Sequence, residues 1–571
     1  MTSAGAGDCL LTDGFHLMVD ALKLNDVATI YGVVGIPITD LARLAQASGI
    51  RYIGFRHESD AGHAAAAGGF LTGKPGICLT VSGPGFLNGM VALANATVNC
   101  FPMVHIAGSS TRAIVDLQRG DYEELDQLAI AKPLAKASYR IDRIDDIGRG
   151  VARAIRTAVS GRPGGVYLDI PGEVLAETIG AADGAATLWK VVDPAPSQSP
   201  SHEVVMKALE LLAGAHRPLI VLGKGAAYAQ AEEQITSLIE ATGIPFVPMS
   251  MAKGLVPDDH RLCAAAARSL ALSRADVVLL VGARLNWLLN HGEPPQWSAE
   301  AKFIHVDIEP AEFDSNQPTT VPLAGDAGSV MSALNAALDR QPVHCPDDWV
   351  AELTARRARN AAVMAKRLAE DPRPMQFYNA LRPIRDFVKD HPEVYVVNEG
   401  ANALDITRNV VEMAVPRHRL DCGTWGVMGI GMGYAIAAAV ETGQPVIAIE
   451  GDSAFGFSAM EIETICRYDL PITVVVLNNG GVYRGDEIDP AGSGPAPTVL
   501  APQARHERII EAFGGAAYHV RTPDDLGAAL AQAHSARRPA LIDCELDPAA
   551  GSESGHLTNL NPRSALQPEL S

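Results

Sequence analysis

The sequence predicts an α/β protein built from three doubly wound, parallel-sheet domains. Short apolar runs of strand length alternate along the chain with stretches whose apolar residues recur at helical spacing. This alternation is typical of parallel sheets that are covered by helices on both faces. A chain of 571 residues is also too long for one hydrophobic core, and its length favours about three domains.

Linker-like stretches suggest where these domains begin and end. Residues 193–200 are rich in proline, and residues 348–373 form a charged helical stretch. The end of the chain is rich in glycine and serine, which is typical of a tail. We therefore expect three domains over residues 1–192, 193–370 and 371–550, followed by a C-terminal lid segment over residues 551–571.

The composition excludes several classes of partner. A formal net charge of −20 argues against a nucleic acid or an anionic membrane as a partner. The eight cysteines contain no Cys-x-x-Cys pair, which indicates a reducing compartment and no structural zinc. The N-terminus lacks a basic start and a long apolar core, so no signal peptide is expected. Together these features predict a cytoplasmic protein.

Two polar residues follow neighbouring buried strands in the third domain. Asp452 comes after the apolar run 445–449, and Asn479 comes after the apolar run 472–477, with a helix expected over residues 459–466. The carboxyl ends of parallel strands meet at one edge of the sheet, where open α/β sheets bind ligands. A carboxylate, an amide oxygen and the carbonyls of the Gly480-Gly481 turn suit Mg²⁺. The same residues also suit ordinary turns.

The spacing of this pair resembles the diphosphate-binding motif of thiamine diphosphate enzymes. Asp452 and Asn479 are 27 residues apart, and they stand in the pairs Gly451-Asp452 and Asn478-Asn479. The resemblance implies that Asp452, Asn479 and the Gly481 carbonyl hold Mg²⁺, which in turn holds the cofactor's diphosphate. Ser453 stands where the family usually has glycine. The first and third domains would then be the pyrimidine-binding and diphosphate-binding domains, with a nucleotide-binding domain between them.

Glu58 follows the strand expected over residues 52–55 and precedes a helix rich in alanine and glycine. Its position alone is typical of a solvated loop carboxylate. In thiamine diphosphate enzymes, however, a glutamate at this place bonds N1′ of the aminopyrimidine. The resemblance therefore implies that Glu58 activates the cofactor as an acid–base partner. The Ser82-Gly83-Pro84-Gly85 turn also resembles this domain. It lacks the spacing of a nucleophile elbow, and we expect Pro84 to impede a helix start that exposed Ser82.

The stretch 118–127, QRGDYEELDQ, is by itself typical of a capped helix start. In this context it resembles the active-site loop of oxalyl-CoA decarboxylases, in which a tyrosine and a glutamate face the substrate. Those positions are Tyr122 and Glu123 here. The pattern around Ile36-Pro37 matches the same family, which implies that Ile36 lines the substrate pocket.

The resemblance covers nearly the whole chain and implies further contacts. Cofactor contacts are expected at Glu58, Ala401, Asn402, Ala403, Gly426, Met428, Asp452, Ser453, Ala454, Asn479 and Tyr483. Met428 would hold the cofactor bent. Substrate contacts are expected at Ile36, Tyr122, Arg268, Asn360, Arg408 and Ser554, and an activating ADP is expected at Arg162, Lys224, Arg284 and Asp307. Each of the ADP and coenzyme A residues also suits an ordinary surface position.

We therefore predict thiamine diphosphate-dependent conversion of oxalyl-CoA to formyl-CoA and carbon dioxide, as a step of oxalate catabolism. Glu58, Tyr122, Glu123, Tyr483 and Ser554 are the expected catalytic residues. A homo-oligomer, either a dimer or a tetramer, is expected because the family's cofactor lies between two subunits. One alternative is a 2-hydroxyacyl-CoA lyase that releases formyl-CoA and an aldehyde, and another is a non-catalytic nucleotide-sensing protein. Acyl selectivity, activation by ADP and the role of His556 are left open by the sequence.

Overall fold

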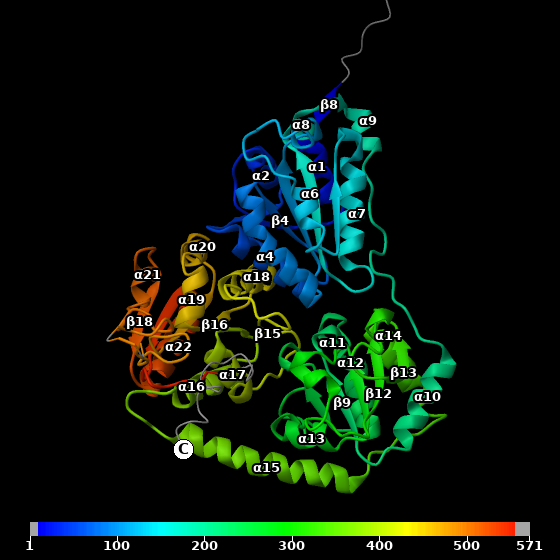
Figure 1. Cartoon of the computed structure of the whole chain (residues 1–571), viewed down its shortest axis with the longest axis vertical. Coiled ribbons are helices and arrows are strands. Elements are labelled where there is room, and N and C mark those ends of the chain that lie inside the picture. Colours follow the sequence, from blue (N-terminus) through cyan, green and yellow to red (C-terminus); the bar gives the residue numbers. More distant parts are fainter. Residues whose placement is uncertain (1–9, 490, 493, 554–571) are drawn as a thin grey trace, which may run out of the picture.

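The computed structural model describes residues 10–489, 491–492 and 494–553. Three parallel sheets with flanking helices dominate the described part of the chain (Figure 1). Each sheet lies within one of the three segments that the linkers separate, so the α/β fold class is confirmed. The domain boundaries themselves stay a prediction.

The first sheet has the strand order β3-β2-β4-β5-β7-β6, and all its neighbours pair in parallel. Its strands are β2 (Thr29–Gly32), β3 (Arg51–Gly54), β4 (Gly76–Thr80), β5 (Met103–Ser109), β6 (Ala137–Arg140) and β7 (Gly165–Pro171). An antiparallel pair, β1 (Leu11–Asp13) and β8 (Thr178–Gly180), lies beside it. The helices are α1 (Gly14–Leu24), α2 (Thr39–Ala47), α3 (Glu58–Thr72), α4 (Pro84–Asn99), α5 (Arg112–Val115), α6 (Gln127–Ala131), α7 (Ile147–Val159), α8 (Gly172–Ala176) and α9 (Ala181–Ala186).

The second sheet has the order β10-β9-β11-β12-β13. Its strands are β9 (Pro218–Leu222), β10 (Phe246–Pro248), β11 (Val277–Val281), β12 (Lys302–Asp307) and β13 (Thr319–Ala324). Its helices are α10 (His202–Ala213), α11 (Lys224–Tyr228), α12 (Glu232–Thr242), α13 (Arg268–Arg274) and α14 (Ala327–Ala337). The long helix α15 (Asp347–Ala369) runs from this sheet to the third one (Figure 1). It is the charged helix that the sequence predicts over residues 348–373.

The third sheet has the order β15-β14-β16-β17-β19-β18. Its strands are β14 (Tyr395–Glu399), β15 (Arg419–Leu420), β16 (Val446–Gly451), β17 (Ile472–Asn478), β18 (Ala516–Val520) and β19 (Ala540–Glu545). Its helices are α16 (Phe377–Asp390), α17 (Ala401–Val410), α18 (Gly431–Thr442), α19 (Asp452–Ser458), α20 (Glu461–Arg467), α21 (Glu507–Glu511) and α22 (Pro523–Ala536).

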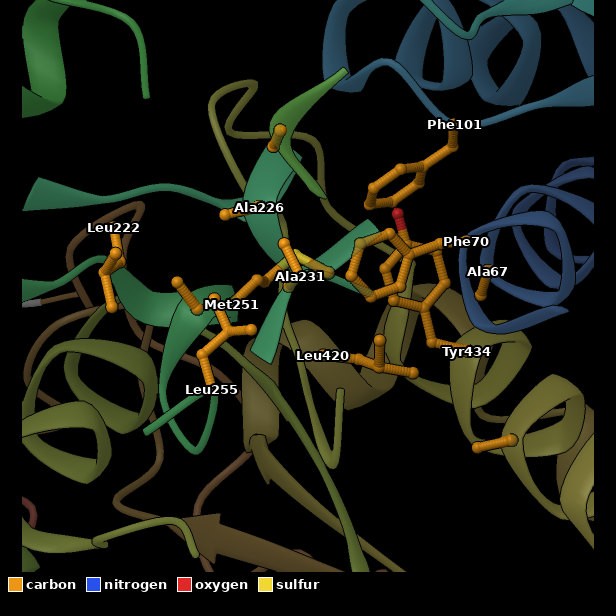
Figure 2. Packing of buried hydrophobic residues seen from close by; sticks show 14 of the residues in the cluster. Ala67, Phe70, Phe101, Leu222, Ala226, Ala231, Met251, Leu255, Leu420 and Tyr434 are labelled. Carbon is orange, nitrogen blue, oxygen red and sulfur yellow. The ribbon is translucent and has the colours of Figure 1, made fainter. Parts of the chain in front are cut away.

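One hydrophobic cluster joins all three sheets. Figure 2 shows Phe70 and Phe101 from the first segment beside Tyr434 of α18, while Leu222 and Met251 of the second segment belong to the same cluster. The ring centroids of Phe70 and Phe101 are 4.9 Å apart. Gly433 of α18 allows this helix to pack closely on α3, because a side chain at Gly433 would meet the Asp60 carbonyl of α3 at 2.6 Å. The segments therefore share a core.

Two expectations about local structure differ from what is observed. The helix expected over residues 459–466 is preceded by an additional helix, α19, which begins at Asp452 itself. Pro84 does not impede a helix, because it occupies the first turn of α4, where a missing N–H has no cost. Ser82 nevertheless remains buried. Within the described ranges, no helix combines the length and the apolar character needed to cross a membrane.

Candidate active site

Asp452 and Asn479 meet at the carboxyl edge of the third sheet, as the sequence predicts. β16 and β17 pair in parallel, and each residue follows directly after its strand. The Asp452 carboxylate accepts the N–H of Ser453 at Oδ1 and the N–H of Gly480 at Oδ2, both at 2.7 Å. Both strand ends are thus tied to one carboxylate.

Asn479 is oriented for an acceptor role. Its Nδ2 donates to the carbonyls of Tyr483 and Ala550, each at 2.8 Å. With both amide hydrogens engaged, Oδ1 is directed the other way. A side chain at Gly481 would meet the Arg484 carbonyl at 2.4 Å, so the turn is closed tightly. This set of hard oxygen donors fits Mg²⁺.

Electrostatics support a cation at this edge. Burial raises the pKa of Asp452 to about 6, although the hydrogen bonds from Ser453 and Gly480 oppose the shift. A buried carboxylate without a counter-ion is costly, and a bound cation would offset that cost.

The start of α17 lies beside the start of α19. Gly400 has a φ of 99°, and a side chain there would meet the Gly451 nitrogen at 3.0 Å. The backbone N–H groups at the start of α17 can bind phosphate. Asn402 lies in this first turn, and Ala403 and Ala454, at the starts of the two helices, are buried.

The C-terminal stretch returns to this region. The Ser552 N–H donates to Asn402 Oδ1 at 2.9 Å, and Asn402 Nδ2 donates to the Tyr483 carbonyl at 3.5 Å. Ser554, the residue expected to contact the acyl group, lies outside the described residues.

The segment that carries Gly426 and Met428 is anchored by a buried glutamate. Glu399 accepts the N–H groups of Gly429 and Gly431 at 2.5 and 2.6 Å. Burial raises its pKa to about 7, with these hydrogen bonds acting in the opposite direction. Met428 is half-buried, and a side chain at Gly426 would meet open space.

Glu58 is the first residue of α3 and is 9% exposed. Its Oε2 accepts a hydrogen bond from Asn88 Nδ2 at 2.9 Å. A side chain at Gly85 would lie 3.1 Å from Oε1, so glycine keeps the approach to that oxygen open. Asn88 carried no signal in the sequence, because its role depends on α4 lying beside α3.

The loop that carries Tyr122 and Glu123 extends into solvent at Tyr122, which is 68% exposed. Glu123 has a φ of 56° and its Oε2 accepts from Ser82 Oγ at 2.9 Å. The loop therefore faces the turn after β4. Ile36 is exposed, and it lies in the neighbouring turn after β2.

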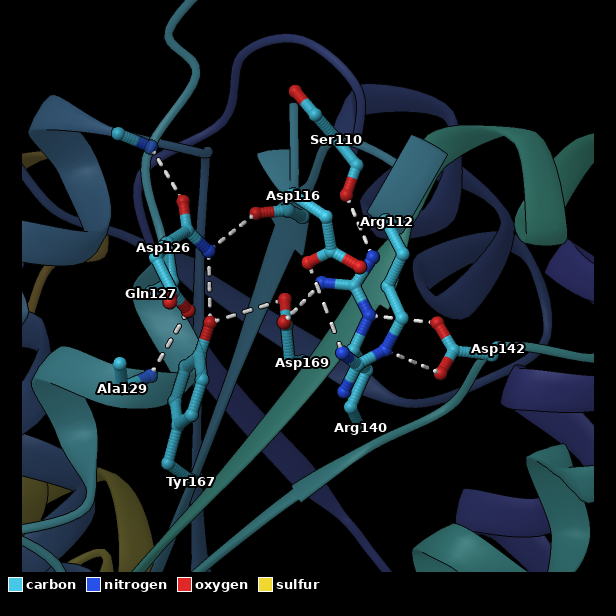
Figure 3. Close-up of polar contacts among 12 residues, drawn as sticks. Ser110, Arg112, Asp116, Asp126, Gln127, Ala129, Arg140, Asp142, Tyr167 and Asp169 are labelled. Carbon is cyan, nitrogen blue, oxygen red and sulfur yellow. Dashed lines mark hydrogen bonds and ion pairs between the residues drawn. The ribbon is translucent and has the colours of Figure 1, made fainter. Parts of the chain in front are cut away.

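A polar network fixes the end of this loop (Figure 3). Gln127 Oε1 accepts from the Gly83 N–H at 2.7 Å, and its Nε2 donates to the Tyr167 hydroxyl at 2.8 Å. Tyr167 in turn donates to Asp169, which pairs with Arg140 at 2.6 Å. The predicted helix start is also present, since Asp126 caps α6.

All four residues expected to contact ADP line one cavity of about 210 Å³. Arg162 pairs with Asp307 at 3.3 Å and with Glu312 at 2.7 Å. Lys224 is partly buried, and this burial lowers its pKa to about 8. Three cationic side chains around one cavity suit a phosphorylated ligand.

Lys224 and Arg284 also line a second cavity of about 100 Å³, and Arg408 is a third cationic residue in its lining. Arg268 donates to the Leu288 carbonyl at 3.1 Å. Burial lowers the pKa of Arg268, and the positive charge of the nearby Arg408 lowers it further. Asn360 lies on α15, where its Nδ2 donates to the Ala266 carbonyl at 2.7 Å.

The wall between these cavities joins all three segments. Asn99 Oδ1 accepts from Lys224 Nζ and from the Thr424 N–H, the latter at 2.9 Å. Arg284 donates to the Val98 carbonyl at 2.8 Å. Sequence reasoning assigned no role to Asn99 or Thr424, because their contacts join residues far apart in the chain.

Three family models match the chain in the order of its sheets. They describe the N-terminal thiamine pyrophosphate-binding domain over residues 12–130, the central domain over residues 205–334 and the C-terminal thiamine pyrophosphate-binding domain over residues 400–544. The fold and the strand-edge site thus define a thiamine pyrophosphate enzyme.

Curated relatives narrow the class. Oxalyl-CoA decarboxylase of Escherichia coli (strain K12) is 59% identical over 97% of this chain and 98% of its own length. The 2-hydroxyacyl-CoA lyase of Oryza sativa subsp. japonica is 47% identical over 98% and 100% of the two chains. Human 2-hydroxyacyl-CoA lyase 1 is 40% identical over 94% and 95%. The chain belongs to the oxalyl-CoA decarboxylase family of thiamine pyrophosphate enzymes, which confirms the resemblance noted in the sequence.

Proposed function

We propose that this protein decarboxylates oxalyl-CoA to formyl-CoA, with thiamine diphosphate and Mg²⁺ as cofactors. The observation that carries this proposal is the 59% identity to an oxalyl-CoA decarboxylase along 97% of the chain. Its identity to the 2-hydroxyacyl-CoA lyases is lower, at 47% and 40%. In the net reaction the carboxylate of the oxalyl group leaves as carbon dioxide, and a proton from water takes its place.

Asp452, Asn479 and the Gly481 carbonyl are proposed to hold Mg²⁺, and the first turn of α17 with Asn402 would bind the diphosphate. Thiamine diphosphate, when bound, supplies an electron sink for the pair that departing carbon dioxide leaves behind. The oxygen donors and the close approach of Gly400 to Gly451 support this assignment.

Glu58 is the proposed acid–base partner of the cofactor's pyrimidine ring. Asn88 already occupies Oε2, which leaves Oε1 to share a proton with the ring nitrogen. Burial of the side chain keeps that proton from exchanging freely with water.

Tyr122, Glu123, Tyr483 and Ser554 are proposed to position the oxalyl group and the water that supplies the proton. The bond from Ser82 to Glu123 supports this role, because it holds Glu123 beside the turn after β4. Ile36 would complete the wall of the substrate pocket.

The second cavity is proposed to receive coenzyme A, with Arg408 and Arg268 near its phosphates and Asn360 farther out on α15. The first cavity is proposed to receive ADP as an activator. Arg162, Lys224 and Arg284 would face its phosphates, and Asp307 its ribose.

We propose a homo-oligomer, a dimer or a dimer of dimers. α4 carries Leu87, Val91 and Val98 at 45%, 44% and 38% exposure, along one helix face. This face lies on the helix that also provides Asn88, next to Glu58. We also propose a cytoplasmic location, which agrees with the lack of Cys-x-x-Cys pairs. Full activity from a species that elutes as a monomer would contradict the oligomer.

The function is tested by incubating the protein with oxalyl-CoA, with and without thiamine diphosphate, and measuring formyl-CoA. A long-chain 2-hydroxyacyl-CoA is run in parallel. We expect formyl-CoA from oxalyl-CoA only when the cofactor is present. Faster formation of formyl-CoA and an aldehyde from the hydroxyacyl substrate would favour the lyase, and no product from either would favour a nucleotide-sensing protein.

A further inference from the structure

Two histidines and a glutamate come together at the amino edge of the third sheet. His391 caps the C-terminus of α16, Glu393 follows just before β14, and His534 lies in the last turn of α22. His391 Nδ1 is 3.3 Å from Glu393 Oε1, and His534 Nε2 is 3.7 Å from the same oxygen. One potential ligand atom from each residue lies within 4.8 Å of the other two.

The ends of two helices make this position electronegative. α16 and α22 pack against each other (Figure 1), and the contact between His391 and His534 shows that their C-terminal ends coincide. The negative ends of both helix dipoles therefore add to the charge of Glu393. The two helix ends and Glu393 favour a cation here over an anion, against the opposing charge of Arg537 near His534.

The imidazoles are suited to metal binding rather than to a doubly protonated pair. Their ring centroids are only 4.4 Å apart, so two imidazolium charges would repel each other. A neutral imidazole keeps a nitrogen lone pair available for a metal ion.

We propose that His391, Glu393 and His534 form a binding site for a divalent metal ion, and that this ion is Zn²⁺. A tetrahedral zinc ion with bonds of about 2.0–2.1 Å sets its ligand atoms about 3.3 Å apart. Two of the distances here, 3.3 and 3.7 Å, already approach that spacing. Water completes the fourth position. The cysteine pattern predicts that the protein has no structural zinc site with thiolate ligands. The site proposed here has no thiolate ligand.

The site lies far from the proposed magnesium site. Strands such as β14 separate the two edges of the sheet, and five residues of strand span about 16 Å. Zinc would link the ends of α16 and α22. Bound zinc would stabilise the folded protein, because the three ligands come together only in the folded state.

The test uses the untagged, full-length holoenzyme with saturating Mg²⁺ and thiamine diphosphate, so that the magnesium site is filled. Zn²⁺ binding is measured by titration calorimetry, and Co²⁺ serves as a spectroscopic probe of coordination. We expect one Zn²⁺ per chain, a higher thermal midpoint with Zn²⁺ and a tetrahedral Co²⁺ absorption band. Turnover should not change.

Variants identify the ligands. H391N and H534N should each lose saturable Zn²⁺ binding, the Co²⁺ band and the thermal shift, whereas H216N, which alters an exposed histidine of the middle segment, should retain all three. Should a histidine variant fail to fold, E393Q, which keeps the side chain's size, provides the same reading. Undiminished Zn²⁺ binding in these variants, or no saturable binding in the wild-type protein, would overturn the proposal.

Discussion

The backbone N–H of Gly480 donates to Oδ2 of Asp452 at 2.7 Å, which joins the ends of two neighbouring strands through one carboxylate. The same carboxylate is the expected magnesium ligand. The loop that supplies Asn479 and Gly481 is therefore positioned by the residue with which it would share the ion.

Replacing Asp452 should abolish metal-dependent cofactor binding. Loss of an outer partner of a metal ligand costs about 10–100-fold in affinity, and D452A removes a ligand and the anchor of the Gly480 turn. We expect thiamine diphosphate binding, measured by calorimetry with and without Mg²⁺, to lose its dependence on the ion. D486A is a matched control, because Asp486 is an exposed carboxylate that pairs with Arg484 in the following loop. Equal affinity in D452A and the wild-type protein would remove Asp452 from the site.

Magnesium affinity should depend on pH around the same group. The pKa of Asp452, raised by burial to about 6, means that the carboxyl is increasingly protonated as the pH falls through about 6. Since Mg²⁺ binds the carboxylate form, its affinity for the cofactor-free protein should fall there, and binding should release protons. Calorimetry in buffers of different ionisation enthalpy measures that release. A flat affinity from neutral pH down to below 6 would contradict the assignment.

Glu58→Gln should separate cofactor binding from turnover. The amide preserves the shape of the buried side chain but cannot share a proton with the pyrimidine, and acid–base groups contribute about 10²–10⁴-fold to rates. Carbon dioxide release should fall by about that factor, while Mg²⁺-dependent cofactor binding persists. E173Q, at an exposed glutamate of the same segment, should leave turnover intact. Undiminished turnover in E58Q would refute the proposed role.

Arg162→Gln should weaken ADP binding without abolishing basal turnover. Arg162 is a cation of the first cavity, and it pairs with Asp307, the expected ribose contact. The variant removes one charge-assisted contact and leaves Asp307 without that partner, so ADP affinity should drop by about tenfold or more. Equilibrium binding of ADP and turnover without ADP are the two readouts. R149Q, at an exposed arginine of α7 paired with Asp146, is the control. ADP affinity unchanged in R162Q would place the nucleotide elsewhere.

Asp60→Asn should flatten the pH dependence of stability. Asp60 is buried against Glu461 of the third segment, and burial, followed by the charge of Glu461, raises its pKa to about 9. Its folded-state pKa therefore exceeds the unfolded value, so its contribution to stability is present at low pH and is lost as the pH rises from about 4 to about 9. Between these two pKa values, this one proton lowers the free energy of unfolding by about 1.4 kcal/mol for each unit by which the pH rises.

An asparagine keeps a hydrogen-bond donor toward Glu461 but has no proton to lose. Urea unfolding of the wild-type protein and D60N across this pH range should show the smaller slope in D60N. The same slope in both proteins would mean that Asp60 is ionised in the folded state.

The strands and their order of appearance could be predicted from the sequence, because apolar runs and helical periodicity are local properties. For the same reason the neighbourhood of Asp452 and Asn479 was predictable, since parallel pairing of consecutive strands brings their carboxyl ends together. α19 was missed because its start coincides with the strand-end turn, and the helix at Pro84 was misjudged because proline is tolerated in a first turn.

The sequence by itself determined the fold class and the chemistry of the oxygen donors at the strand edge, both of which depend on residues close together in the chain. Only the tertiary structure decided that Asn88 holds Glu58, that Asn99 bonds Lys224 and Thr424, and that the ends of α16 and α22 coincide at His391 and His534. These contacts join residues far apart in sequence, and they arise from how the sheets and helices pack, which no local pattern encodes.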